Sequence, residues 1–210
     1  MTVHLRDVDT DVGIARLHQR TPRATEIKGT LLLGHGAGGG VNSADLQALS
    51  ELDRAGWHTV LIEQPWRVAG RRIAVPPAKL DLATRQIVDM LRSENLLPRP
   101  WVLGGRSAGA RVACRLSEYA QACVLIAFPL VPVRKDGTPG PSRAGELMVP
   151  LHHGIPTLVV QGDRDRFGGP SDVAAVAPGA RVASYPGDHA VTRDPPALSQ
   201  AVARFLDALT

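Results

Sequence analysis

The sequence predicts one α/β domain built on a mainly parallel sheet with helices on both of its faces. Short apolar runs rich in β-branched residues alternate with longer stretches of helical periodicity along the chain. Nearly every position in these runs is apolar, so a strand formed by them has two apolar faces. Such strands are typical of parallel sheets, which are covered on both faces. The 210 residues are 44% hydrophobic and 21% charged, an ordinary globular composition, and no internal repeat or linker divides them. We therefore expect residues 1–210 to form a single domain with an eight-stranded sheet.

The first half of the chain contains the expected strands Val3–Arg6, Val12–Gln19, Thr30–Leu33 and Thr59–Ile62. The first two are expected to pair as a hairpin. A helix is predicted to begin at Asn42 or Ser43, either of which can cap a first turn. It ends at about Arg54, just before Gly56. A second helix begins near Pro77, and its apolar face comprises Leu80, Ala83, Ile87 and Leu91.

The second half continues the alternation with strands at Trp101–Leu103, Cys123–Phe128, Thr157–Val160 and Arg181–Tyr185. A helix follows the first of these strands and runs to Tyr119. The apolar face of the last helix comprises Leu198, Val202, Phe205 and Leu209. A proline-rich excursion covers Pro129–Pro156 and is short enough to predict a minimal cap. In sheets of this kind, active sites lie at the carboxyl ends of the strands.

Charge and hydropathy argue against several classes of partner. Of the 24 basic residues, 21 are arginines scattered along the chain, so the net charge of +4 does not indicate nucleic-acid binding. No run approaches the ~18 apolar residues of a membrane helix. Residues 1–11 lack the apolar core of a secretory signal, and we expect a cytoplasmic protein. Cys114 and Cys123 are too few for a disulfide framework and are expected as small core residues.

The strongest motif is Gly105-Arg106-Ser107-Ala108-Gly109, a G-x-S-x-G sequence between an apolar strand and a helix. A serine on such a sharp turn has strained backbone angles, and the flanking glycines let neighbouring chain pass close by. The turn exposes the serine Oγ at a helix N-terminus, where the helix dipole favours a developing negative charge. This context favours Ser107 as a nucleophile over a serine that merely caps the helix.

A second glycine-rich turn, His35-Gly36-Ala37-Gly38-Gly39, directly follows an expected strand. Acyl transfer requires backbone N–H groups directed at the oxygen of the tetrahedral intermediate. We expect one from Ala108, the residue after the nucleophile, and the other from Ala37, with Gly38 as the alternative. His35 occurs too early in the chain to be a general base and is expected to stabilise the turn.

The same turn also fits a dinucleotide-binding fingerprint. Gly34, Gly36 and Gly39 satisfy G-x-G-x-x-G between a strand and a helix, and Glu63 ends the next strand as an acidic residue. However, this strand follows an N-terminal hairpin and does not open the fold. We keep a dinucleotide-binding domain as the weaker alternative.

The C-terminal third supplies the groups that a serine nucleophile requires, a base and an acid that orients it. Asp163 and Asp165 follow one expected strand, and His189 follows the next. All fall just beyond strand ends, at the sheet edge expected for Ser107. A dinucleotide-binding fold does not need this pair.

These motifs together resemble the α/β-hydrolases, especially the small, nearly lidless dienelactone-hydrolase-like branch. The matching segments are His35–Gly39, Gly104–Gly109, Gln161–Gly168 and Phe128–Leu130, and the likeness extends over about residues 27–208. The resemblance implies an α/β-hydrolase fold with Ser107 as nucleophile, His189 as base and Asp165 as acid. It selects Asp165 because the usual acid follows the pattern G-x-x-D, which leaves Asp163 as a turn residue.

Several residues are expected to contact a small-molecule substrate. Gly36 and Gly38 belong to the turn beside the nucleophile, Arg71 and Arg72 follow the Thr59–Ile62 strand, and Arg106 precedes Ser107. An arginine near the site can hold an acidic group of the substrate, because a guanidinium matches a carboxylate or phosphate. In an arginine-rich chain these side chains can also simply be solvated. Arg106 has a further possible role, which is to fix the turn at Gly105–Gly109, called the elbow below, by bonding to a neighbouring loop.

The predicted function is a serine hydrolase that cleaves a carboxylic ester or a related acyl bond. The alternative from another class is a catalytically silent binding module with the same fold, since fold alone does not decide activity. No cofactor is expected. No metal is expected either, because adjacent His152 and His153 direct their rings to divergent sides and no carboxylate–histidine cluster at ligand spacing occurs elsewhere in the sequence. The identity of the substrate and the oligomeric state cannot be read from the sequence.

Overall fold

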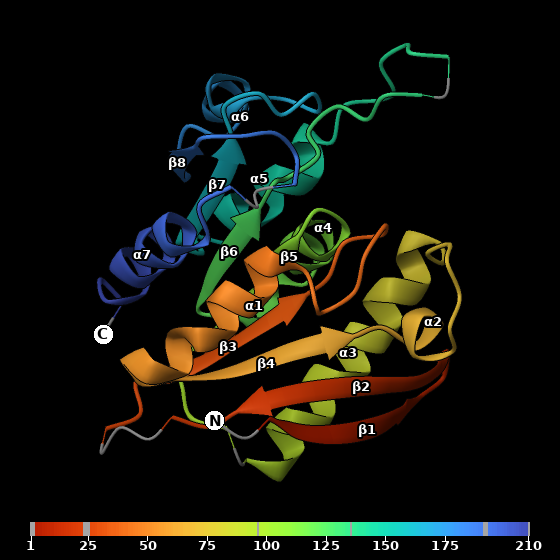
Figure 1. The fold of residues 1–210 in the computed structure, drawn as a ribbon, viewed down its shortest axis with the longest axis vertical. Helices are drawn as coiled ribbons and strands as arrows, with labels where there is room; N and C mark the ends of the chain where they lie inside the picture. Colours follow the sequence, from red (N-terminus) through yellow and green to blue (C-terminus); the bar gives the residue numbers. More distant parts are fainter. Residues whose placement is uncertain (1–2, 23–25, 96, 135, 191–192, 210) are drawn as a thin grey trace.

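A computed structural model describes residues 3–22, 26–95, 97–134, 136–190 and 193–209, and within these residues eight strands form one sheet (Figure 1). The strands are β1 (His4–Thr10), β2 (Gly13–Arg20), β3 (Gly29–Gly34), β4 (Trp57–Glu63), β5 (Trp101–Arg106), β6 (Ala122–Ile126), β7 (Thr157–Gly162) and β8 (Arg181–Tyr185). Their spatial order is β1-β2-β4-β3-β5-β6-β7-β8. Strand β2 is antiparallel to β1 and β4, and the other pairings of these strands are parallel. The predicted mainly parallel eight-stranded α/β sheet is confirmed.

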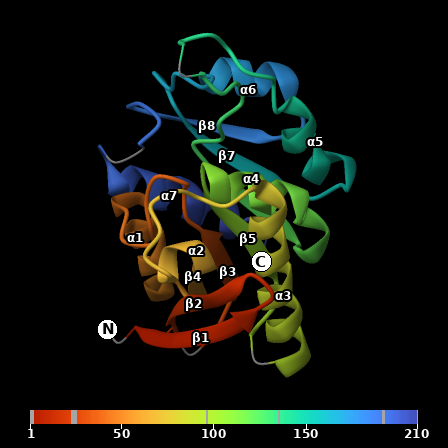
Figure 2. The ribbon, with the colours of Figure 1, turned by 90° about the vertical axis from the view of Figure 1, so that its right-hand side faces the viewer.

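Helices cover both faces of the sheet (Figure 2). One face carries α1 (Ala44–Ser50) and α7 (Pro195–Leu206), and the other carries α3 (Pro77–Glu94), α4 (Ala108–Arg115), α5 (Ala144–His152) and α6 (Pro170–Val176). The short α2 (Pro65–Val68) follows β4. Two 3-10 turns, Glu51–Ala55 and Ser117–Tyr119, extend α1 and α4, so these two helical regions end close to where the sequence predicts.

The central strands explain the two separate layers of core. In β3, Leu31 and Leu33 pack in the cluster under α1 and α7, whereas Leu32 packs in the cluster under the helices of the opposite face. All three leucines are fully buried. Because side chains alternate across a strand, a strand covered on both faces needs an apolar residue at every position. This requirement produces the continuous apolar runs of the sequence.

Helix α5 lies within the proline-rich excursion between β6 and β7, and the sequence analysis does not predict it. The helix contains Gly145 and Pro150, which have poor helix propensity. Leu147 and Pro150 are nevertheless buried against the core, and this packing outweighs propensity. The chain between β6 and α5 projects away from the sheet (Figure 1), which leaves little cap over the strand ends.

Smaller differences concern the ends of elements. Strand β5 continues beyond Leu103 to Arg106, and β6 ends at Ile126 before Phe128. Leu209 lies after the end of α7 but still packs against the same core cluster as the helix. Strand ends of this kind depend on pairing with neighbours, as in the β5–β6 register that joins Arg106 to Ile126.

The strand order creates the place for a site. Strands β4 and β5 lie on opposite sides of β3, so the order in which strands are added to the sheet reverses at β3 while the strands stay parallel. In sheets of this kind, ligands bind at the carboxyl ends of the strands where the order reverses. The loops that follow β7 and β8 reach the same edge, because these strands are parallel to β5.

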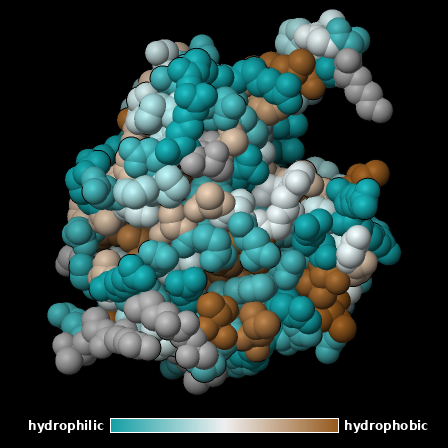
Figure 3. Space-filling model, viewed as in Figure 1, coloured by the Kyte–Doolittle hydropathy of each residue, from teal (hydrophilic) through white to brown (hydrophobic). Residues whose placement is uncertain are grey.

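The surface seen in Figure 3 is mostly hydrophilic, with separate hydrophobic spots. The exposed large apolar side chains of the described residues are Val3, Leu5, Ile14, Ile27, Ile73 and Val133. Among the described residues, no helix combines the length and the apolar character needed to cross a membrane.

Candidate active site

Ser107 occupies the turn between β5 and α4, with backbone angles φ 53° and ψ −103°. A non-glycine residue in this region carries strain of about 1–3 kcal/mol. Hydrogen bonds on both sides of the turn stabilise this strained backbone conformation. The N–H of Ser107 donates to the carbonyl of Ile126 at 2.9 Å, and the carbonyl of Ser107 accepts from Arg111 in α4.

The two glycines of the motif permit a close backbone approach to the end of β3. A Cβ atom added to Gly105 would lie 2.3 Å from the carbonyl oxygen of Gly34, and one added to Gly109 would lie 2.2 Å from it. Gly105 also has a φ of 151°. Any larger residue at either position would collide with backbone, so the spacing of the motif follows from the packing of β5 and α4 against β3.

Ser107, His189 and Asp165 meet at the carboxyl edge of the sheet. His189 Nε2 lies 3.0 Å from Ser107 Oγ, and His189 Nδ1 lies 2.8 Å from Asp165 Oδ2. An ionised carboxylate can only accept hydrogen bonds, so Nδ1 carries the proton in this arrangement. Nε2 is then left to accept from the Ser107 hydroxyl. Such a chain of contacts is able to remove a proton from the serine oxygen.

The carboxylate of Asp165 is buried and well supplied with donors. Besides His189, its donors are the N–H of Phe167 at 2.9 Å and Gln161 Nε2 at 2.9 Å. Its side chain is fully buried, and these bonds compensate for the loss of water around the charge. The Phe167 ring packs edge-on against His189, with ring centroids 4.6 Å apart. Both the position and the orientation of the imidazole are therefore fixed.

Gln161 is a residue whose role the sequence analysis does not identify. Its Nε2 donates to Asp165 and also to the carbonyls of Phe128 and Gly168, and its Oε1 accepts from the N–H of Phe128. It thus ties the Asp165 loop to the end of β6. The residue belongs to the Gln161–Gly168 segment, but local sequence gives no sign of its distant partners.

Asp163, the competing carboxylate, points elsewhere. Its Oδ1 accepts from the N–H of Gly187 at 2.8 Å, which joins the loop after β7 to the loop that carries His189. Asp188 is exposed and accepts from the N–H of Ala190, and this hydrogen bond lowers the pKa of its carboxyl. In this geometry Asp165 is the carboxylate in contact with the His189 ring.

His35 holds the turn after β3 by both ring nitrogens. Nδ1 lies 2.9 Å from the carbonyl of Gly36, and the N–H of Gln64 donates to Nε2 at 3.1 Å. A carbonyl can only accept, so the ring is neutral with its proton on Nδ1. Burial lowers the pKa of His35, which agrees with a neutral ring. The residue connects the end of β3 to the end of β4.

The turn held by His35 lies directly beside the elbow. A Cβ atom on Gly36 would lie 3.6 Å from the Cβ of Ser107. Within the described chain, the N–H groups of Ala37 and Ala108 have no hydrogen-bond acceptor, so both remain free to bind an oxygen atom. Gly38 is exposed at the tip of the turn.

The structure also explains why the fingerprint of a dinucleotide site is incomplete here. In that fingerprint the third glycine allows close packing of helix and strand. A Cβ on Gly39 would have no heavy atom within 4 Å, so the position does not require glycine for packing. Gly34 and Gly36 instead lie against the elbow.

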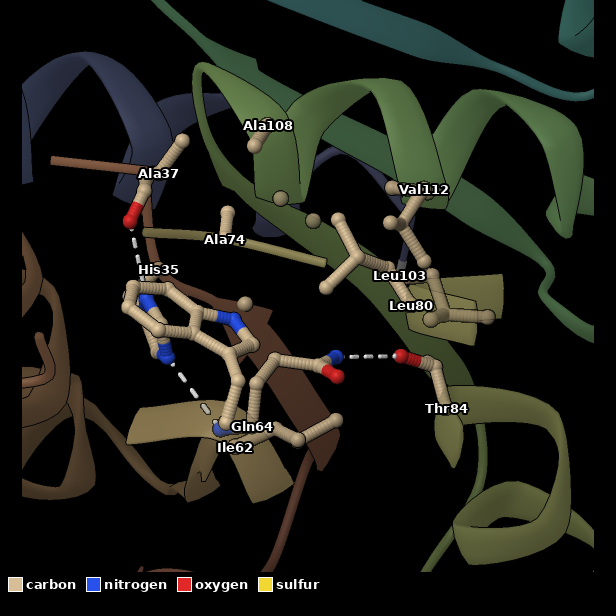
Figure 4. A pocket seen from close by; sticks show the side chains of 16 residues that line it. His35, Ala37, Ile62, Gln64, Ala74, Leu80, Thr84, Leu103, Ala108 and Val112 are labelled. Carbon is tan, nitrogen blue, oxygen red and sulfur yellow. Dashed lines mark hydrogen bonds between the residues drawn. The ribbon is translucent and has the colours of Figure 1, made fainter. Parts of the chain in front are cut away.

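A narrow cavity opens beside the turn and the start of α4 (Figure 4). Ala37 and Ala108 line it together with apolar side chains from α3 and α4, among them Leu80 and Val112. Its free volume is about 10 Å³, the space of one water-sized group. Gln64 and Trp66 also line this cavity, and neither is singled out by the sequence analysis.

Comparison with known families agrees with this fold. The family described as an alpha/beta hydrolase domain matches residues 27–194, which is most of the chain. The chain belongs to the α/β-hydrolase family. The dinucleotide-binding alternative is thereby set aside. No curated protein matches this hydrolase in sequence.

Solved structures share the fold of this hydrolase at low sequence identity. An alpha-beta serine hydrolase homologue from Coxiella burnetii has a TM-score of 0.77 and 19% identity, with 97% of each chain covered. A serine hydrolase without a lid from Xanthomonas campestris has a TM-score of 0.73 and 18% identity over 99% of this chain and 94% of its own. Est1E from Butyrivibrio proteoclasticus has a TM-score of 0.72 and 15% identity over 97% of this chain and 98% of its own.

Arg106 joins three parts of the hydrolase. Its Nη2 donates to the carbonyl of His189 at 3.2 Å, and its Nη1 lies against Gly36, 2.9 Å from where a Cβ would be. Its Nε lies 2.9 Å from Oδ2 of Asp45, whose side chain is fully buried. Both of these atoms lack a hydrogen bond among the described residues, so the contact is an ion pair without hydrogen-bond alignment. The contribution of Arg106 to substrate binding stays a prediction.

The other predicted arginines lie farther out. Arg71 and Arg72 are exposed, and Arg71 lines a neighbouring cavity of about 370 Å³ between α2 and the β1–β2 turn. Gln64 and Trp66 line this cavity as well as the narrow one. A further recess of about 380 Å³ contains His189, Phe167 and the exposed Arg164. Among the described residues, no cluster of three or more histidine, cysteine or acidic side chains is placed to hold a metal ion.

Proposed function

We propose that this α/β-hydrolase cleaves carboxylic esters or related acyl bonds of small-molecule substrates. The observation that carries the proposal is the line of contacts from Ser107 Oγ through His189 to Asp165, with distances of 3.0 and 2.8 Å. These are hydrogen-bond distances in the order that nucleophilic acyl transfer requires.

The reaction has two halves. His189 Nε2 takes the hydroxyl proton as Ser107 Oγ attacks the acyl carbon, and the negative charge moves to the carbonyl oxygen. The N–H groups of Ala37 and Ala108 stabilise that oxygen. The intermediate collapses, the alcohol leaves with the proton from His189, and the acyl group stays on Ser107. Water, deprotonated by His189, then attacks the acyl carbon; the bond to Ser107 Oγ breaks, His189 returns the proton to Oγ, and the carboxylic acid is released.

Two further facts support acyl chemistry. The free N–H groups of Ala37 and Ala108 suit an oxyanion, and each such donor typically contributes about 100- to 1000-fold to the rate. A structure of Est1E, which has 16% identity and a TM-score of 0.72, contains ferulic acid. Ferulic acid is a carboxylic acid, the class of product that ester hydrolysis releases.

The test combines covalent labelling with turnover. A fluorophosphonate probe should modify Ser107, and Ser107→Ala should lose labelling and reduce kcat/KM for p-nitrophenyl acetate by about 1000-fold or more. Ser171→Ala is the matched control, because Ser171 is exposed on α6 and lines neither the cavity at Ala37 and Ala108 nor the recess at His189. This variant should behave as wild type. A folded wild-type protein with neither labelling nor turnover would identify a silent binding module instead.

A further inference from the structure

The cavity beside the elbow contains two buried polar atoms without partners. Trp66 is 3% exposed and Gln64 is 5% exposed, and both line the cavity. Among the described residues, Trp66 Nε1 has no acceptor and Gln64 Oε1 has no donor. A buried polar group left without a partner typically costs about 1–3 kcal/mol. A ligand that supplies both hydrogen-bond partners would therefore bind more tightly than one of similar shape that supplies neither.

The positions of these groups are held by their neighbours. Gln64 Nε2 donates to Thr84 Oγ1 at 2.8 Å, as Figure 4 shows, so the amide is oriented from α3. The Trp66 ring packs edge-on against His35, with ring centroids 5.4 Å apart. The remaining lining is largely apolar, for example Leu103 and Val112. The two unpartnered atoms are thus fixed polar points in an apolar pocket.

The proposed mechanism decides which part of a substrate enters this cavity. With the carbonyl oxygen at Ala37 and Ala108, the acyl chain and the leaving group extend in different directions from the acyl carbon. The leaving group must receive its proton from His189, which lines the separate recess and not this cavity. The acyl chain therefore points toward the cavity that Ala37 and Ala108 line, and a group on that chain can enter it.

Trp66 Nε1 is a donor and Gln64 Oε1 is an acceptor, and this combination favours one kind of substituent on the acyl chain. A hydroxyl has one O–H donor and accepting lone pairs, so it offers both the donor that Gln64 Oε1 lacks and the acceptor that Trp66 Nε1 lacks. A methyl group satisfies neither atom. The free volume of about 10 Å³ is the space of one water-sized group, so it suits the hydroxyl alone, with the rest of a short acyl chain outside it.

We infer that this hydrolase acts on esters of short hydroxycarboxylic acids, whose acyl hydroxyl binds between Trp66 and Gln64. The inference rests on the proposed function and specifies its acyl substrate. A site built to bind a substrate hydroxyl discriminates strongly against the analogue without it, because the buried polar groups then stay unpaired.

The experiment compares phenyl esters of propionic, lactic and 3-hydroxypropionic acid. Each kcat/KM is divided by the alkaline hydrolysis rate of the same ester, which removes the inductive effect of the hydroxyl. The better hydroxy ester should exceed the propionate by about tenfold or more. A normalised ratio within about threefold of one for both hydroxy esters would overturn the inference.

Variants locate the effect. Trp66→Phe removes the N–H donor and Gln64→Met removes the amide acceptor at similar length, and either change should bring the normalised ratio close to one. Trp57→Phe is the matched control, because Trp57 is 1% exposed with an unpartnered Nε1 but lies outside the cavity lining. It should retain the wild-type ratio. A hydroxyl preference that survives both site variants would also overturn the inference.

The proposed function has separate readouts. Labelling of Ser107 and turnover of the propionate ester test the hydrolase activity itself. Turnover with no hydroxyl preference refutes the substrate inference alone. Absence of labelling and of turnover on all three esters refutes the proposed function and the inference with it.

Discussion

For the replacement of Gly109 with alanine, helix propensity predicts a higher free energy of unfolding, whereas packing predicts a lower one. Gly109 lies in the first turn of α4, where alanine is ordinarily favoured over glycine by about 1 kcal/mol. The added Cβ, however, would lie 2.2 Å from the carbonyl oxygen and 2.4 Å from the carbonyl carbon of Gly34. Both atoms are backbone, so no rotamer change can relieve the overlap.

The magnitude follows from the displacement required. A normal contact needs about 1 Å more, so α4 and β3 must separate by about that distance. Overpacking of this kind costs about 1–3 kcal/mol. With rigid backbone on both sides we take the upper end, and subtracting the propensity gain leaves a loss of about 2 kcal/mol in the free energy of unfolding. This corresponds to a fall in Tm of about 4–8 °C.

The same displacement moves the Ala108 N–H relative to Ala37. A misplacement of about 1 Å in a catalytic constellation costs about 100-fold in rate, and we expect that loss in kcat/KM for p-nitrophenyl acetate. Stability is measured by urea unfolding followed by circular dichroism.

Gly145→Ala is the matched control for this test. Gly145 lies in α5, where a Cβ would have no heavy atom within 4 Å. This variant should be up to about 1 kcal/mol more stable than wild type, with unchanged hydrolysis. A Gly109→Ala protein that unfolds at the same or a higher urea concentration than wild type would refute the packing argument.

Three further predictions concern the acid, the pH dependence and the arginines. Asp165→Asn should reduce kcat far more than Asp163→Asn, because Asp165 contacts His189; a larger loss at Asp163 would assign the acid to the other carboxylate. Burial lowers the pKa of His58, so below pH ~6.5 the unfolded chain binds a proton that the folded chain does not, and stability falls with acidification. His58→Leu should show a smaller loss of unfolding free energy between pH 7 and pH 5 in urea titrations, and an unchanged loss would contradict this assignment. If Arg71 and Arg72 hold an acidic group, a carboxylate-bearing ester should be cleaved about tenfold faster than its neutral analogue at low salt, and the double alanine variant should abolish the difference; equal wild-type rates would exclude the role.

Sequence patterns predict the features that depend on residues close together in the chain, such as buried strands and sharp turns. The Leu31–Leu33 run predicts a strand covered on both faces, and G-x-S-x-G predicts the turn at Ser107. The meeting of Ser107 with His189 could be anticipated because parallel strands end at a common edge. The roles of these residues in catalysis stay predictions.

Features that depend on distant partners could not be predicted. The sequence analysis raises a bond from Arg106 to a neighbouring loop, and the bond to the carbonyl of His189 is of this kind. Its ion pair with Asp45, about sixty residues away in α1, is indicated by neither sequence pattern nor composition. Helix α5 forms because Leu147 packs against the core although Pro150 disfavours a helix. The sequence likewise does not indicate that Trp66 Nε1 is buried without a partner, because this depends on the side chains that pack around it.

The contacts of His189 determine when the site is completed during folding. Its bond to Ser107 spans 82 residues of chain, and the bond from Arg106 to its carbonyl spans 83. Strand β8 precedes His189, so the imidazole can reach the elbow after β8 has joined the edge of the sheet. On the ribosome, the elbow and the turn after β3 emerge well before this strand. The nascent chain therefore carries Ser107 before its contact with His189 can form, and the proposed catalytic arrangement is complete when β8 has joined the sheet.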